Sequence, residues 1–255
     1  MVFSSSSWAS KAEVLLISDI DDTIKISHVL NTWDALKNAF AFESRFRGMA
    51  DVYRRLSADR DFQVAYVSNA PEVIMKGAHK RLLREGWFPS GPLRLRRNFK
   101  GQEHKKQSIL KLSHRFDPSL VILVGDNGES DVHTYHEMAK ILREQGREVI
   151  TYIHQVYSDD RGAKLYPDQI GFVTAVDLSV DLLEKGIVSE EFHQDTALRQ
   201  VPSLVTEADY KRGKPAYFPS WLNCSDYKWV WGKQDFLTEM AKTRILNRCQ
   251  CSTLF

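Results

Sequence analysis

Continuous apolar stretches, each ending in a polar loop, dominate the pattern of the first half of the chain. They span residues 14–17, 62–67 and 120–124. Apolar runs of this length that end in turn-forming residues are typical of strands buried on both faces of an α/β sheet. We therefore predict central strands at these places.

Segments with mixed apolar and polar residues separate these strands. We predict helices at 49–56, 72–85, 103–112, 131–145 and 178–184, an extended segment at 93–99, and further strands at 149–153 and 171–176. Strands that alternate with helices favour a mostly parallel sheet covered on both faces. We therefore expect a three-layer α/β/α sandwich with a Rossmann-like sheet. The few dozen residues between the first two strands leave room for a short flap but not for a separate domain. We therefore expect a cap over the sheet edge that is small or absent.

The character of the chain changes after residue 187. Residues 201–219 are polar and irregular in pattern, aromatic residues gather at 217–221 and 227–231, and an amphipathic helix is predicted at 233–248. We expect a core domain at 12–187 and a C-terminal helical and aromatic appendage at 188–255 that packs on it. The aromatic residues suit either a lipid-facing surface or a buried contact with the core, and we favour burial because aromatic side chains mostly serve cores.

Two carboxylates follow the first predicted strand, at the sheet edge where ligands of such folds bind. Asp19 and Asp21 are two residues apart, so they share one direction if the chain stays extended and separate if it turns. One carboxylate can attack phosphorus while the other protonates the leaving oxygen and then activates water. A plain polar turn explains the same residues. A calcium-binding EF-hand loop does not, because Ile24 occupies its glycine position.

A second acidic loop, residues 125–131, follows the strand predicted at 120–124. In a parallel sheet its Asp126 and Asp131 fall beside Asp19. Carboxylates that are this close repel one another, and a bound divalent cation relieves the repulsion. Oxygen donors without cysteine or histidine favour Mg²⁺. We therefore predict a Mg²⁺ site here in preference to a solvated turn.

Ser68 lies at the end of the second predicted strand, just before a predicted helix, and could bind an anion there. Backbone N–H groups at a helix start attract anions, although such a serine is also an ordinary helix cap. Lys105 lies in the first turn of the helix predicted from 103, where the helix dipole disfavours a cation. A lysine there needs an anionic partner. Lys106 could take the place of Lys105, because the phase of this helix is open.

Composition narrows the classes of protein that fit. The 255 residues carry a net charge of +2, which gives little support for nucleic-acid binding. No apolar run approaches the roughly 20 residues of a membrane span, and residues 1–10 do not have the pattern of a secretory signal. We expect a cytoplasmic protein with an option of peripheral membrane contact. Cys224, Cys249 and Cys251 are odd in number and lie late in the chain, which argues against a disulfide framework.

Four motifs in order resemble those of the haloacid dehalogenase-like phosphatase superfamily. They are Asp19-Ile20-Asp21-Asp22-Thr23, Val67-Ser68-Asn69, His104-Lys105, and Gly125-Asp126 with Asp131. The longer stretches around them are similar to the catalytic domain of actin patch protein-type phosphatidate phosphatases. This resemblance covers about residues 13–175.

The resemblance implies a role for each matching residue. Asp19 would be the nucleophile, and Asp21 the general acid and then the general base. Mg²⁺ would be held by Asp19, the backbone carbonyl of Asp21, and Asp126, with Asp131 behind these ligands. Ser68 and the backbone around Asn69 would bind phosphoryl oxygens, and Lys105 would neutralise their charge.

The function expected from the sequence is therefore a Mg²⁺-dependent phosphomonoesterase with an aspartyl-phosphate intermediate. Phosphatidate, which would yield diacylglycerol and phosphate, is the leading substrate. A small soluble phosphate ester is the first alternative. A catalytically silent binding module on the same fold is the second, and the retention of every acidic, hydroxyl and lysine position argues against it.

Overall fold

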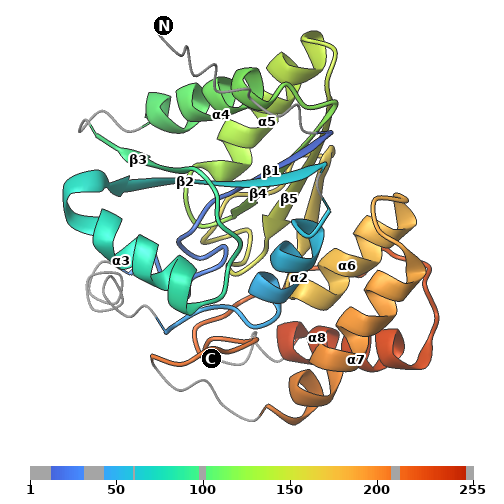
Figure 1. Ribbon diagram of the computed structural model, residues 1–255. Helices are drawn as coiled ribbons and strands as arrows, with labels where there is room; N and C mark the ends of the chain where they lie inside the picture. The colour runs from blue at the N-terminus through green and yellow to red at the C-terminus, as the bar shows by residue number, and fades with distance from the viewer. Residues whose placement is uncertain (1–12, 32–42, 60, 98–101, 208–212, 251–255) are drawn as a thin grey trace, which may run out of the picture.

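A six-stranded sheet forms the centre of the computed structural model (Figure 1), which describes residues 13–31, 43–59, 61–97, 102–207 and 213–250. Its strands are β1 (Val14–Ser18), β2 (Phe62–Pro71), β3 (Leu93–Arg96), β4 (Leu120–Asp126), β5 (Glu148–His154) and β6 (Gln169–Phe172). They lie in the order β3-β2-β1-β4-β5-β6, and every neighbouring pair is parallel. The predicted α/β fold with a parallel sheet is confirmed.

Alternating side chains of the strands point to two separate hydrophobic cores. Leu15 and Ile17 of β1 face α4 (Gln102–Phe116) and α5 (Asp131–Glu144), whereas Leu16 faces the opposite layer. That opposite layer contains α2 (Met49–Leu56), α3 (Glu72–Glu85) and α6 (Ala175–Glu184). The sheet is therefore covered on both faces, as the continuous apolar runs predicted.

The strand order reverses between β1 and β4. The chain continues from β1 to β2 on one side, and later returns to place β4 on the other side of β1. At such a reversal the loops leave in opposite directions and open a crevice at the carboxyl ends of the strands. Asp19 directly follows β1 and Asp126 is the last residue of β4, so this crevice is where the two acidic loops meet.

The strand predicted at 171–176 is only partly correct. The strand β6 ends at Phe172, and α6 already begins at Ala175. The reason is a capping box, in which the Thr174 hydroxyl accepts from the Val176 N–H while Asp177 accepts from the backbone N–H of Thr174. This local hydrogen bonding turns an apolar stretch into a helix start.

The irregular structure predicted for 201–219 is wrong over its first part, because α7 (Glu190–Thr206) runs through it. Pro202 lies inside this helix, and the buried side chains of Val201 and Leu204 hold the helix against the core. Packing thus outweighs the helix-breaking effect of the proline. The predicted C-terminal helix is confirmed as α8 (Phe236–Gln250), which packs with α6 and α7.

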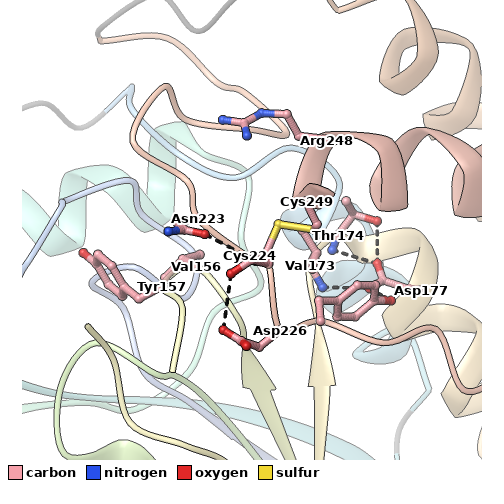
Figure 2. The surroundings of a disulfide bond; sticks show 12 residues. Val156, Tyr157, Val173, Thr174, Asp177, Asn223, Cys224, Asp226, Arg248 and Cys249 are labelled. Atoms are coloured by element: carbon pink, nitrogen blue, oxygen red, sulfur yellow. Dashed lines mark hydrogen bonds between the residues drawn. A yellow bond between two sulfur atoms is a disulfide. The ribbon is translucent and has the colours of Figure 1, made fainter. Parts of the chain in front are cut away.

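Cysteine usage argued against a disulfide framework, and the structure nevertheless contains one disulfide bond. Cys224 is joined to Cys249 in the last turn of α8 (Figure 2). The Asn223 N–H also donates to the Val156 carbonyl after β5, at 3.1 Å. A single bond between residues 25 apart is a local staple of the appendage and not a framework, which the cysteine count alone does not reveal.

The aromatic residues of the appendage are mostly buried, as favoured from the sequence. Tyr217, Phe218, Tyr227 and Trp231 belong to the same hydrophobic core as α2 and α6. The proposed boundary at 187/188 stays a prediction. Among the described residues, no helix combines the length and apolar character needed to cross a bilayer. Much of the predicted flap between the first two strands, residues 32–42, lies outside the described residues.

Candidate active site

Three carboxylates from separate elements meet at the crevice between β1 and β4. Asp19 follows β1, Asp126 ends β4, and Asp131 begins α5. Each offers one oxygen, and these oxygens all lie within 4.8 Å of one another. The three side chains are buried. We call this group the acid cluster, and it is the arrangement that the two acidic loops predicted.

A buried lysine completes the acid cluster. The Lys105 Nζ on α4 donates to Asp19 Oδ1 at 2.8 Å and also to Asp131 Oδ1. Lys106, the other candidate, instead points to the surface and forms an ion pair with Glu137. The phase of α4 thus places Lys105, and not Lys106, against the acid cluster.

The acid cluster carries more negative charge than Lys105 balances. Burial raises the pKa of Asp19 well above its usual range against the pull of Lys105, and burial with the neighbouring carboxylates does the same for Asp126. One oxygen of Asp131, Oδ2, is buried without a hydrogen-bond partner. Gly125 allows this close approach, because a Cβ there would lie 2.4 Å from that oxygen. Oxygen donors with unbalanced charge fit a hard divalent cation.

Asp21 lies at the rim of the site and separate from the acid cluster. Its carboxylate contacts Lys25 Nζ at 3.3 Å, accepts from the Ser27 hydroxyl at 2.6 Å, and faces His79 Nε2 at 3.5 Å. Burial acts to raise its pKa, but Lys25, His79 and Ser27 outweigh burial and lower the pKa to about 2. The loop therefore turns between the two aspartates and gives them different surroundings, which was one of the two outcomes that the sequence left open.

The second predicted motif reaches the same rim. The Ser68 hydroxyl lies 3.5 Å from Asp21 Oδ2 and accepts from the Ala70 N–H at 3.0 Å. The Asn69 Oδ1 is buried without a partner. The structure therefore brings Ser68 beside Asp21, and Ser68 also stabilises its own turn.

Sequence reasoning missed several residues that shape this site. Lys25 and His79 are both buried against Asp21, although they come from different segments. Asp22 accepts from the backbone N–H groups of residues 27, 28 and 29 and from the Tyr157 hydroxyl, which folds the loop after Asp21 back on itself. Only Lys25 had a local signal, four residues after Asp21. The contacts of Asp22 with residues 27–29 lie within one loop, whereas His79 and Tyr157 reach this loop only through tertiary packing.

The appendage also reaches this loop. The ring of Trp221 stacks on His28 with a centroid distance of 4.5 Å and on Tyr157 at 5.2 Å. Because Tyr157 donates to Asp22, the C-terminal segment supports the loop that follows Asp21. This contact was not predicted, since nothing in the sequence pairs residue 221 with residue 28.

Comparison with known proteins agrees with this geometry. The family model for the catalytic domain of phosphatidate phosphatase APP1 matches residues 14–153, which is more than half of the chain. The chain belongs to this family. The resemblance drawn from the four motifs is thereby confirmed, and the matched span of the phosphatidate phosphatase catalytic domain contains the whole acid cluster, Lys105, Asp21 and Ser68.

Relatives of this family are longer than the chain. Phosphatidate phosphatase APP1 of Saccharomyces cerevisiae is 30% identical over 143 residues, which cover 51% of this chain and 24% of that protein. An uncharacterized protein of Schizosaccharomyces pombe is 27% identical over 159 residues, covering 57% of this chain and 26% of the relative. The chain thus spans about a quarter of the length of these relatives.

Among solved structures, a chain of the Pnkp1/Rnl/Hen1 RNA repair complex aligns with a TM-score of 0.41 at 15% identity, covering 56% of this chain and 43% of that one.

Proposed function

We propose that the chain is a Mg²⁺-dependent phosphomonoesterase that acts through an aspartyl-phosphate intermediate, with phosphatidate as the leading substrate. The observation that carries the proposal is the acid cluster. Asp19, Asp126 and Asp131 converge with buried Lys105 at the strand-order reversal of a phosphatidate phosphatase catalytic domain. Burying this many like charges destabilises the fold. Such a cluster is therefore more typical of a binding or catalytic site than of a structural element.

In the first half of the reaction, an Asp19 oxygen attacks phosphorus and the bond from phosphorus to the ester oxygen breaks. Asp21 gives its proton to that leaving oxygen. In the second half, Asp21 takes a proton from water, the water oxygen attacks phosphorus, and the bond to Asp19 breaks to release phosphate. The separation of the two aspartates into different surroundings suits these different tasks.

The low pKa of Asp21 fits the second half directly, because a base must start as the carboxylate. For the first half, Asp21 must hold a proton. An anionic phosphoryl group that enters beside Ser68 and competes for Lys25 adds negative charge near Asp21 and raises its pKa. Substrate binding would then load the acid.

The donor set fits the predicted ion. Asp19, Asp126 and the backbone carbonyl of Asp21 would hold Mg²⁺, and the unpartnered Asp131 oxygen is the further group that is available. When bound, Mg²⁺ supplies charge neutralisation for a phosphoryl group that approaches the anionic Asp19. The Lys105 Nζ donates to Asp19 Oδ1 and so holds this carboxylate in place. Ser68 and the backbone around Asn69 would bind phosphoryl oxygens.

The decisive test separates chemistry from substrate choice. Purified protein is assayed with Mg²⁺ on a soluble aryl phosphate, on a small soluble ester and on phosphatidate in mixed micelles. We expect turnover of the aryl phosphate, fastest turnover with phosphatidate, and a loss of at least about 10⁴-fold in Asp19→Asn.

Three other results would count against parts of the proposal. Full activity in Asp19→Asn removes the nucleophile assignment. Preference for the small ester makes the soluble-substrate alternative correct. Absence of turnover on every substrate, with Mg²⁺ binding retained by titration calorimetry, favours the silent binding module. Exposed Asp59→Asn serves as the matched control for the Asp19 substitution.

A further inference from the structure

Two large apolar side chains are exposed in the first turn of α3. Val73 is 95% exposed and Ile74 is 62% exposed. Adjacent exposed aliphatic side chains mark contact sites more often than isolated ones do. We call Val73 and Ile74 the apolar tip of α3.

The apolar tip lies at the same sheet edge as the acid cluster. In Figure 1, α3 starts directly at the arrowhead of β2, the strand that carries Ser68. Only four residues lie between Ser68 and Val73. A flat surface that touches the apolar tip would therefore lie beside the proposed phosphate-binding turn, where a phosphate ester must enter.

Cations surround the apolar tip. Lys76 and Arg97 both form ion pairs with Glu72 at 2.7 Å, so this one acid is shared by two bases. Lys80, one turn further along α3, is also exposed. Arg94, Arg97 and Lys111 line an adjacent hollow of about 700 Å³ together with Glu72 and Glu103. The surface next to the apolar tip is therefore net positive although the whole chain is nearly neutral.

We propose that the apolar tip and its cations dock the catalytic domain onto a bilayer that contains anionic lipid. The inference rests on the proposed function, because it names the surface through which a lipid phosphate would be reached. Aliphatic side chains enter the interfacial region while lysine and arginine attract anionic headgroups, and the two features together attach a protein to a membrane surface more stably than either does alone.

The appendage offers a rival surface. Val230 is 72% exposed and Phe236 is 78% exposed. Their charged neighbours are mixed, since Lys233 pairs with Glu190 and also faces Asp235 at 3.8 Å. This region lacks the excess of cations found around α3, so charge complementarity to an anionic bilayer favours the apolar tip.

The experiment compares two double variants. Val73→Ser/Ile74→Ser removes the apolar tip, and Val230→Ser/Phe236→Ser removes the rival pair at similar exposure. Binding is measured by flotation with phosphatidylcholine vesicles that contain or lack phosphatidate. We expect wild type to float only with phosphatidate-containing vesicles, the first variant to bind at least about tenfold more weakly, and the second to bind as wild type does.

Two further readouts make the result specific. Turnover of a soluble aryl phosphate and the melting temperature should be unchanged in Val73→Ser/Ile74→Ser, because neither side chain contacts the acid cluster in the described residues. Lys80→Glu should weaken flotation, more so at low salt. If the Ser/Ser variant of α3 floats as well as wild type, or if the appendage variant alone loses binding, the proposal is wrong.

Failure of the docking surface remains distinct from failure of the proposed function. If wild type does not turn over the aryl phosphate, the proposed phosphatase reaction is wrong, whatever the result of vesicle flotation. Retained turnover on soluble esters together with absent flotation removes only the docking surface.

Discussion

Two groups of buried carboxylates among the described residues differ in how their oxygens are used. In the acid cluster, Asp131 keeps one oxygen without a partner and Asp19 shares its only described cation with Asp131. The second group, Asp177 and Asp181 on α6, has donors on all four oxygens, and we call it the cap cluster.

Those donors are mostly neutral groups fixed by the fold. Asp177 accepts from the backbone of residues 173 and 174 and from the Thr174 and Tyr227 hydroxyls, and part of this network is visible in Figure 2. Asp181 accepts from the Tyr152 hydroxyl at 2.6 Å and from the Trp231 indole at 2.8 Å. The cap cluster thus joins α6 to the appendage, and it needs no further ligand.

The difference teaches how to separate structural from functional buried acids. Burial alone does not distinguish them, because burial raises the pKa of Asp177 as it raises those of Asp19 and Asp126. Oxygens without hydrogen-bond partners and uncompensated charge do distinguish functional acids, because they destabilise the fold unless a ligand binds to them. The same substitution, aspartate to asparagine, should therefore have opposite effects in the two groups.

The largest effect is expected for Asp126→Asn. Removing a carboxylate from the acid cluster should lower Mg²⁺-dependent turnover by about 10³-fold or more, because the ion's charge stabilisation is worth several kcal/mol. In chelator, the melting temperature should equal or exceed that of wild type, because repulsion with Asp19 and Asp131 is relieved. Steady-state kinetics and a thermal melt check both; a large loss of stability in chelator would mean that the acid cluster is structural.

The next effect is expected for Asp177→Asn in the cap cluster. The amide group of asparagine places a donor where the backbone and Tyr227 also donate. Breaking this buried network should cost about 3–5 kcal/mol of unfolding free energy. Turnover per folded molecule should stay within about twofold at low temperature. Denaturant titration measures the cost, and a kcat loss as large as that of Asp126→Asn would remove the distinction between the two groups.

A smaller effect is expected when the staple beside the cap cluster is removed. Cys249→Ser opens the bond to Cys224, three residues before Tyr227. Closing a loop of 25 residues restricts the unfolded chain by about 3 kcal/mol, so stability should fall by up to that amount. The same melt under reducing conditions should erase the difference between wild type and variant. A difference that persists after reduction would point to lost packing of the side chain.

The acid cluster was predictable and the cap cluster was not, for a physical reason. Asp19 and Asp126 end apolar strands, and parallel strands bring their carboxyl ends to one edge, so local pattern sufficed to bring them together. The partners of Asp177 include Tyr227, 50 residues away, and depend on how α6 to α8 pack. His79 beside Asp21 was missed for the same reason, because the two residues lie 58 positions apart. The helix through Pro202 was missed because its stability comes from burial of Val201 and Leu204 and not from its local sequence.

The smallest expected effect is a pH dependence of stability at Asp126 in the acid cluster. The pKa of Asp126 is raised above its usual value in the fold by burial and by neighbouring carboxylates. Between the usual and the raised pKa, the folded state binds a proton that the unfolded state lacks. The ion-free fold therefore gains stability as pH falls through that window and loses it as pH rises.

Asparagine mimics the protonated carboxyl, so in chelator Asp126→Asn should melt a few degrees above wild type at about pH 8, and the gap should narrow toward about pH 5. Excess Mg²⁺ should reverse the order at the higher pH, because the ion stabilises only a fold that binds it. A gap that widens as pH falls would contradict the raised pKa of Asp126 and would show that the fold stabilises its carboxylate.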